Sequence, residues 1–228
     1  MKFTKYAPVF LLALWLTACS SATQTTVLSI ARLDCATCGE AIATKLSKQE
    51  GIDKATFDKN KVELHVVGQA DLDIFAMAEP FAKAEKVALI AGAGKGSYLP
   101  PKAPPTKADV KTVVEGGSTV PKLSDVVVAG KITVIEFGAV WCGPCRVVDA
   151  HMFGLLAKQP DLAYRKLDVG DWGTPLADHY LAKISKLPYI IVFDAKGKKI
   201  EDIAGLSLER LDAAIAKARQ GNSKDGES

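Results

Sequence analysis

Alternation of apolar and polar positions predicts strands in the first part of the chain. Residues 62–67 alternate cleanly, so Val62, Leu64 and Val66 are expected to face a core, and Glu63 to face solvent. The same alternation is present in residues 26–33. A strand with one apolar face belongs to a sheet that is covered on one side only.

Apolar positions at helical spacing predict two helices between these strands. Gly51 is suited to end the first helix, and Pro80 is expected to kink the second or to mark a late start. The predicted elements alternate as β-α-β-β-α-β, at residues 26–33, 36–49, 52–57, 62–67, 72–84 and 87–90. This order predicts an α+β domain of the ferredoxin-like type at residues 26–92.

The second half of the chain has longer apolar runs. Residues 132–137 and 189–193 are apolar throughout most of their length, as in strands that are buried on both faces of a sheet. Residues 194–197 are typical of a hairpin turn into a further strand. Helices are expected at residues 144–158, 174–184 and 206–219. The pattern predicts an α/β domain at residues 119–219.

Glycine and proline separate the two domains. Residues 93–118 begin with spaced glycines, continue with four prolines between Pro100 and Pro105, and end with Gly116 and Gly117. Such a segment is expected to be a linker, semi-stiff at its centre and flexible at its ends. Residues 220–228 are polar and without periodicity, so a disordered tail is expected there.

The N-terminus has the pattern of a targeting segment at residues 1–18. Lysines precede an apolar run at residues 9–16, which is too short to span a bilayer. The run ends in Leu-Thr-Ala-Cys19 and resembles the lipobox of bacterial lipoproteins. The resemblance implies cleavage before Cys19, lipidation of its thiol and anchoring at the periplasmic face of the cell envelope. Ser20 favours the outer membrane in a two-membraned host, and an ordinary signal peptide is the alternative.

Composition narrows the possible chemistry. The net charge of +3 and the lack of basic runs exclude an electrostatic footprint for nucleic acid. No Gly-rich phosphate loop or serine nucleophile motif is present. The five cysteines form one single residue and two C-x-x-C pairs, a pattern that indicates thiol chemistry before architecture.

The second pair follows a buried strand. A tight turn after that strand places Cys142 at the start of a helix, where free N–H groups and the helix dipole favour a thiolate. Cys145 lies one helical turn later and can resolve a mixed disulfide by attacking Cys142. Pro144 fits the first turn because its missing N–H is not needed there. A static disulfide and half of a zinc site are the alternatives, and zinc would need further ligands.

The run Trp141-Cys-Gly-Pro-Cys145, with the strand before it, resembles the thioredoxin family over residues 120–218. The resemblance implies a thioredoxin fold and an enzyme that exchanges its dithiol with protein disulfides without a cofactor. Trp141 is then the motif tryptophan. Glu136 stands where thioredoxins carry a buried Asp that shuttles the proton of the resolving thiol.

Further positions match the thioredoxin pattern. Lys166 falls where family members place a lysine near the buried acid, and Pro188 matches the cis-proline that docks substrate. Leu187 and Ala150 depart from the pattern of cytosolic thioredoxins. The sequence of the predicted helix at residues 144–158 is more similar to the periplasmic branch of the family. Gly-Pro between the cysteines resembles reducing thioredoxins, so a reductase is favoured and an oxidase is the alternative. Outside the cytoplasm a reductase needs a membrane or periplasmic electron donor.

The first pair, Cys35 and Cys38, lies between the first strand and first helix of the β-α-β-β-α-β pattern. Two soft thiolates at a helix start can bind Cu(I). The segment resembles a heavy-metal-associated domain over residues 26–92, although Arg32-Leu-Asp34 replaces the family's usual approach to the first cysteine. A redox-active pair and a structural disulfide remain alternatives.

These patterns predict a membrane-anchored, extracytoplasmic thiol–disulfide oxidoreductase with an appended C-x-x-C domain. That domain is expected to bind Cu(I) or to be a redox substrate of its own chain, with Cys142 attacking an oxidised Cys35–Cys38 pair. The alternative is a copper-binding or metal-delivery protein in which the thioredoxin-like domain is a scaffold or maintains the metal site.

Overall fold

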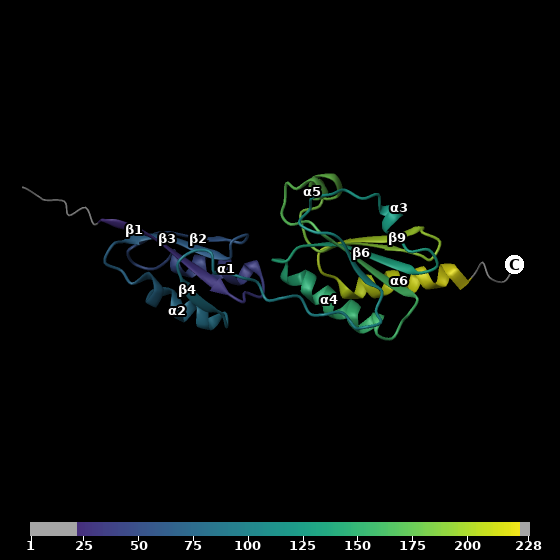
Figure 1. The fold of residues 1–228 in the computed structure, drawn as a ribbon, viewed down its shortest axis with the longest axis horizontal. Helices are drawn as coiled ribbons and strands as arrows, with labels where there is room; N and C mark the ends of the chain where they lie inside the picture. The colour runs from purple at the N-terminus through teal and green to yellow at the C-terminus, as the bar shows by residue number, and fades with distance from the viewer. Residues whose placement is uncertain (1–21, 224–228) are drawn as a thin grey trace, which may run out of the picture.

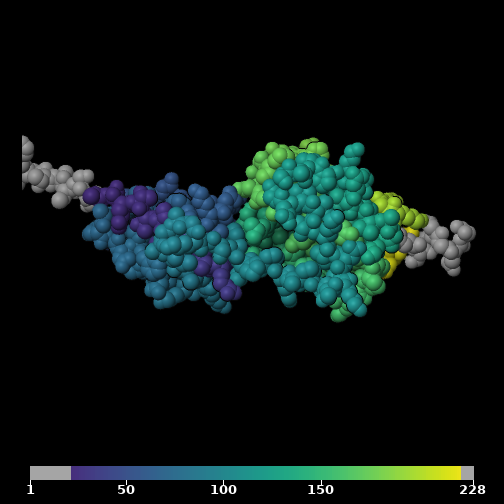
Figure 2. Space-filling view, viewed as in Figure 1, coloured from purple at the N-terminus to yellow at the C-terminus, as the bar shows by residue number. Residues whose placement is uncertain are grey.

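A computed structural model describes residues 22–223, which form two lobes joined at a narrow waist (Figures 1 and 2). The predicted targeting segment, with Cys19 and Ser20, lies outside the described residues. Within residues 22–223, no helix is both long enough and apolar enough to cross a membrane.

The first domain is an antiparallel sheet covered on one face by two helices (Figure 1). Its strands lie in the order β2-β3-β1-β4, with every neighbouring pair antiparallel. Leu28, Leu64 and Val66 on the sheet pack with Ile42 and Ala78 from the helices. The elements are β1 (Thr23–Ala31), α1 (Ala36–Leu46), β2 (Ile52–Asp58), β3 (Glu63–Gln69), α2 (Ile74–Ala84) and β4 (Ala88–Ala91). The predicted β-α-β-β-α-β fold is confirmed.

Glu63 corrects the predicted alternation, because its side chain is buried rather than solvent-facing. The segment after β4 folds back over this part of the sheet, and its Gly94 N–H donates to Glu63 Oε1 at 2.5 Å. His65 Nε2 also lies 3.3 Å from the Glu63 carboxylate. Burial of the carboxylate is tolerated because these polar groups replace water.

The second domain has a central five-stranded sheet in the order β5-β7-β6-β8-β9. The first three strands in that order are parallel, and β8 and β9 are antiparallel to their neighbours. Helices α4 and α6 cover one face, and α3 and α5 cover the other (Figure 1). The elements are β5 (Val110–Val114), α3 (Leu123–Val126), β6 (Ile132–Gly138), α4 (Gly143–Leu156), β7 (Leu162–Asp168), α5 (Pro175–Tyr180), β8 (Tyr189–Phe193), β9 (Lys199–Ala204) and α6 (Leu208–Ser223).

The expected linker at residues 93–118 is shorter than its composition suggested. Its beginning belongs to the first domain, where Leu33 bonds through its N–H to Ser97 and through its carbonyl to Leu99. Its end contains β5, which pairs with β7 as an edge strand of the second sheet. Only the proline-rich centre connects the domains without regular structure. Similarly, α6 continues to Ser223, past the expected start of the tail at residue 220.

Candidate active site

Cys142 lies where the central strand of the second sheet meets a helix. Every residue of β6 is buried, and α4 begins directly after Cys142. The Cys145 N–H donates to Cys142 Sγ at 3.2 Å, and Pro144 occupies the first turn. Because the first N–H groups of a helix lack intrahelical acceptors and carry partial positive charge, a thiolate is stabilised at this position.

Cys142 and Cys145 form a disulfide, with their Cα atoms 5.3 Å apart. Their side chains are only 4% and 5% exposed, respectively. Cys145 lines a partly open cavity, whereas Gly143 beside Cys142 faces the first domain. The two sulfurs are therefore positioned differently: Cys145 beside the cavity, and Cys142 beside the domain interface.

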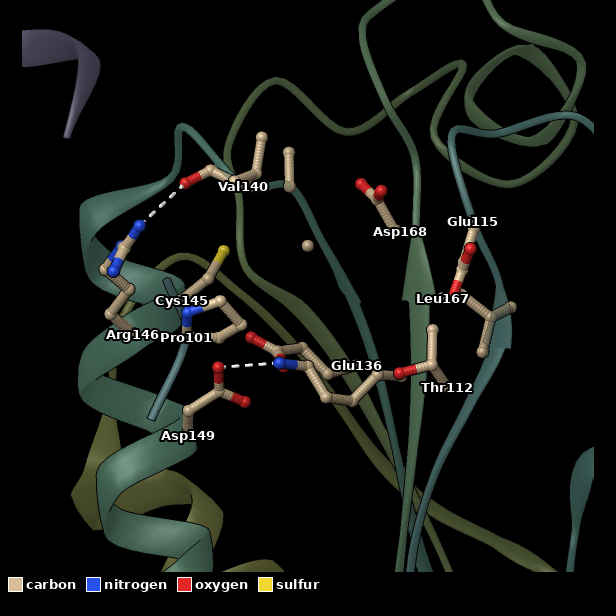
Figure 3. Close-up of a pocket in the computed structure, with 13 residues that line it drawn as sticks. Pro101, Thr112, Glu115, Glu136, Val140, Cys145, Arg146, Asp149, Leu167 and Asp168 are labelled. Carbon is tan, nitrogen blue, oxygen red and sulfur yellow. Dashed lines mark hydrogen bonds and ion pairs between the residues drawn. The ribbon is translucent and has the colours of Figure 1, made fainter. Parts of the chain in front are cut away.

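The cavity behind Cys145 has a volume of about 260 Å³ and brings three polar side chains together (Figure 3). Glu136 comes from β6, Lys166 from β7 and Asp149 from α4. Pro101, from the segment between the domains, lines another part of the same wall. The predicted linker therefore helps to enclose this site.

Glu136 is fully buried, and its environment favours the protonated form. Burial, followed by the nearby charge of Asp149, raises the pKa of Glu136 from 4.5 to about 8. Its Oε1 has no hydrogen-bond partner among the described residues. A Cβ at Gly138 would lie 3.4 Å from this oxygen and 3.3 Å from Cys145 Sγ, so both groups border the same small space. Glu136 can thus exchange a proton with Cys145 near neutral pH.

Asp149 and Tyr164 complete this polar group, although neither was identified as a site residue from the sequence. Lys166 Nζ lies 2.6 Å from Asp149, so the predicted lysine pairs with this acid and acts on Glu136 only through its charge. The Tyr164 hydroxyl donates to Glu136 and lies 3.1 Å from Asp149 Oδ1. A sequence signal existed for Asp149, because it stands four residues after Cys145 on the same helical face.

Trp141 and Pro188 flank the site from separate loops. The Trp141 indole N–H donates to the carbonyl of Gly170 at 2.7 Å, which fixes the ring beside the loop that follows β7. The Leu187–Pro188 peptide bond is cis, directly before β8. Because β8 neighbours β6 in the sheet, Pro188 is placed next to the strand that leads to Cys142.

Cys35 and Cys38 lie at the start of α1, with their sulfurs 3.6 Å apart. Cys35 Sγ is also 2.9 Å from the Thr37 hydroxyl. Burial, the hydrogen bond with Cys35 and the charges of nearby groups raise the pKa of Cys38 to about 11. The pKa of Cys38 is therefore raised although the residue lies in the first turn of α1.

The pair fits only a metal ion that accepts few ligands. Two thiolates at one helix start suit a soft, two-coordinate ion such as Cu(I). They are too few for a tetrahedral zinc site. In the described part of the chain, no group of three or more His, Cys, Asp or Glu side chains could hold a metal ion. Binding would also require the Cys38 thiol to lose its proton.

The two C-x-x-C loops lie against each other across the domain interface. The Ala36 N–H donates to the Trp141 carbonyl at 3.1 Å. A Cβ at Gly143 would lie 2.9 Å from Cys35 Cβ and 3.2 Å from Cys35 Sγ. The close approach therefore depends on the absence of a side chain at Gly143. Sequence reasoning gave both motifs but not this contact.

Comparisons with known proteins agree with this geometry. The thioredoxin family model matches residues 120–217. A thioredoxin H-type from Fagopyrum esculentum is 35% identical over 105 residues, which cover 46% of this chain and 84% of the relative. Mouse thioredoxin is 31% identical over 85 residues, covering 37% of this chain and 77% of its own length.

A solved structure of reduced thioredoxin from Schistosoma mansoni has 26% identity and a TM-score of 0.37, over 48% of this chain and 98% of that one. The family match and the relatives cover the domain that carries Cys142 and Cys145. The predicted enzyme class, a thiol–disulfide oxidoreductase, is therefore confirmed. The chain belongs to the thioredoxin family through this C-terminal domain.

Proposed function

We propose that the chain is a lipid-anchored, extracytoplasmic reductase of protein disulfides. The observation that carries this proposal is the arrangement of Cys142 at the start of α4, with Cys145 and the buried Glu136 beside one cavity. The Gly-Pro dipeptide between the cysteines supports the reducing direction. The lipobox-like sequence ending at Cys19 supports the anchor, and Ser20 supports the outer membrane of a two-membraned host.

The geometry gives each group a step in the exchange. The Cys142 thiolate attacks a substrate disulfide, which releases one substrate thiolate and leaves a mixed disulfide on Cys142. Cys145 then transfers its proton to ionised Glu136 and attacks Cys142 Sγ, which releases the second substrate thiolate. A carboxyl group with a pKa of about 8 can accept and return this proton at neutral pH. An external donor must then reduce Cys142–Cys145.

The Cys145→Ser variant tests the reductase proposal, in a Cys35→Ser/Cys38→Ser background that leaves no other free thiol near Cys142. Without the resolving thiol, Cys142 is expected to retain substrate proteins as mixed disulfides, because the second step cannot occur. The variant is to be expressed in the envelope of a two-membraned bacterium, and complexes resolved on non-reducing gels before and after dithiothreitol. We expect several dithiothreitol-sensitive complexes in the outer-membrane fraction, and their release to the soluble fraction when Cys19→Ser is added.

Cys142→Ser in the same background is the matched control, because it keeps only Cys145, the thiol that lines the pocket. It is expected to capture no substrate. Equal capture by both variants would contradict the assignment of Cys142 as the attacking thiol. Absence of complexes in the Cys145→Ser strain, with the protein present at wild-type level, would contradict the reductase proposal.

A second candidate function is binding of Cu(I) by Cys35 and Cys38, for storage or delivery. The observation that favours it is the pair of sulfurs 3.6 Å apart at the start of α1. In this alternative the thioredoxin domain serves as a scaffold or keeps the metal-binding pair reduced. It predicts that metal affinity depends on the first pair alone.

Titration of the reduced protein with Cu(I) against a chromogenic chelator tests this candidate. Cys35→Ser/Cys38→Ser is expected to weaken binding by more than about 100-fold, because it removes both soft ligands. Cys142→Ser/Cys145→Ser, a matched loss of two thiols, is expected to bind as the wild type does. If the second double variant loses the affinity and the first retains it, Cu(I) binding by the first domain is excluded.

A further inference from the structure

The first domain contacts the catalytic face of the second (Figure 1). The two lobes meet where α1 and α4 begin, so the contact brings together two helix starts that each carry a C-x-x-C pair. Cys142, only 4% exposed, is covered in this arrangement. The first domain therefore lies where an external disulfide substrate would have to approach.

We propose that the Cys35–Cys38 pair is the built-in redox partner of Cys142–Cys145, and that the two pairs exchange a disulfide through a mixed disulfide between Cys35 and Cys142. This inference rests on the proposed function, and it specifies which dithiol the thioredoxin domain meets first. It assigns the first pair a redox role in addition to any metal binding.

The contact selects Cys35 as the reacting thiol of the first domain. Cys35 immediately precedes α1 and lies against Gly143, the neighbour of Cys142. Cys38 lies one turn later and packs against the hydrophobic core of the first domain. The Ala36 N–H donates to the Trp141 carbonyl and so joins the two backbones. Ala36 follows Cys35 and Trp141 precedes Cys142, so this hydrogen bond holds the two cysteines near each other.

Polar contacts around this interface fix its orientation. The Lys59 ammonium lies 2.5 Å from Asp171 and 4.1 Å from the centroid of the Trp141 ring. The Asn60 side-chain amide donates to the same Asp171 carboxylate at 3.0 Å. On the other side, Arg146 donates to the Leu99 carbonyl at 2.7 Å. These groups are partly buried, so their interactions are less weakened by solvent than those of exposed pairs.

The exchange between the two cysteine pairs needs no other oxidant or reductant. The Cys35 thiolate attacks Cys142 Sγ, the Cys142–Cys145 bond breaks, and Cys145 leaves as a thiolate that takes a proton. The Cys38 thiolate then attacks Cys35 Sγ and releases Cys142 as a thiolate. The first pair loses two electrons and the second pair gains them. The protons of Cys35 and Cys38 are released when their thiolates form, and one proton is taken up by Cys145. The reverse sequence, from reduced Cys142 to an oxidised first pair, uses the same intermediate.

The full-length Cys38→Ser/Cys145→Ser variant tests the proposal, because it leaves one thiol on each side of the interface. Equilibration in glutathione buffers of increasing oxidising strength, followed by non-reducing peptide mapping, measures the effective concentration of Cys35 at Cys142. A flexible linker alone gives values on the order of a millimolar. Docking as described is expected to raise the value at least about tenfold above that.

Three matched variants complete the test. In the same background, Lys59→Met is expected to lower the effective concentration several-fold, whereas Lys61→Met, at a solvent-exposed lysine of the same turn, leaves it unchanged. Cys35→Ser/Cys145→Ser, which offers Cys38 instead, is expected to link at least tenfold less well. The inference would be overturned by an effective concentration no higher than a flexible linker gives. Equal disulfide formation through Cys38, or no effect of Lys59→Met, would also overturn it.

Insulin reduction by Cys35→Ser/Cys38→Ser separates this inference from the proposed function. The second domain retains its dithiol in that variant, so insulin reduction with dithiothreitol as electron source is expected to persist. If insulin reduction persists but the effective concentration of Cys35 at Cys142 is only that of a flexible linker, the built-in redox partner is excluded and the proposed reductase function is not. Loss of insulin reduction in this variant, with both domains folded, would contradict a self-sufficient reductase domain.

Discussion

Cys142→Ser is expected to abolish reduction of insulin disulfides, with the rate falling to that of dithiothreitol alone. The reason is that the Cys142 sulfur is the one at the helix start, where its thiolate is stabilised, whereas Cys145 lies one turn later and lines the cavity. A serine hydroxyl cannot replace it, because it is not ionised at neutral pH. Turbidity of insulin with dithiothreitol as reductant is the measurement.

The fold of this variant is expected to remain intact. Cys142 precedes α4, and a serine at a helix start can accept the Cys145 N–H bond in place of the sulfur. Circular dichroism and thermal unfolding under reducing conditions, compared with the reduced wild type, check this point. Cys35→Ser is the matched control, one thiol lost in the other domain, and is expected to keep insulin reduction. Near-wild-type activity in Cys142→Ser would refute the catalytic assignment.

Glu136→Gln is expected to stabilise the second domain increasingly as pH rises. The pKa of Glu136 is about 8 in the folded protein and near 4.5 in an unfolded chain, so the folded state holds the proton between these values. Wild-type stability is therefore fully present below about pH 4.5 and falls as pH rises towards about 8. Because glutamine has no charge to bury, the variant escapes this loss, which is on the order of 5 kcal/mol when complete.

Urea unfolding of both proteins from pH 5 to pH 9 measures this difference. Glu79→Gln, at an exposed position on α2, is the control and should show no such trend. Asp149→Asn is expected to move the pH window of the loss downwards, because the Asp149 charge helps to raise the pKa of Glu136. A difference between wild type and Glu136→Gln that stays constant with pH would mean that Glu136 does not titrate in this range.

The same Glu136→Gln substitution should also slow catalysis. Glutamine cannot accept the Cys145 proton, so resolution of the mixed disulfide is expected to slow by about tenfold or more. Stopped-flow reduction of a disulfide peptide separates this step from the first attack, which should be unaffected. Higher stability with slower resolution is the combined signature of a buried acid that is retained for proton transfer.

Sequence reasoning anticipated both folds because local pattern encodes them. The buried runs at 132–137 and 189–193 became β6 and β8, and the alternating run at 62–67 became most of β3. It placed the start of the second domain at residue 119, after β5, because the glycines and prolines around that strand indicate a linker. An edge strand has few buried residues of its own, and its partner β7 is some 50 residues away in sequence.

The sequence by itself determined the reactive parts: two C-x-x-C pairs at helix starts, a buried strand leading to Cys142, and an acid at Glu136. Only the tertiary structure decided what surrounds them. Folding brings Asp149 to Glu136, covers Glu63 with the segment at Gly94, and places Cys35 against Gly143. Local spacing reports which side of an element is buried. It does not report which distant group lies on that side, because such contacts depend on packing between elements.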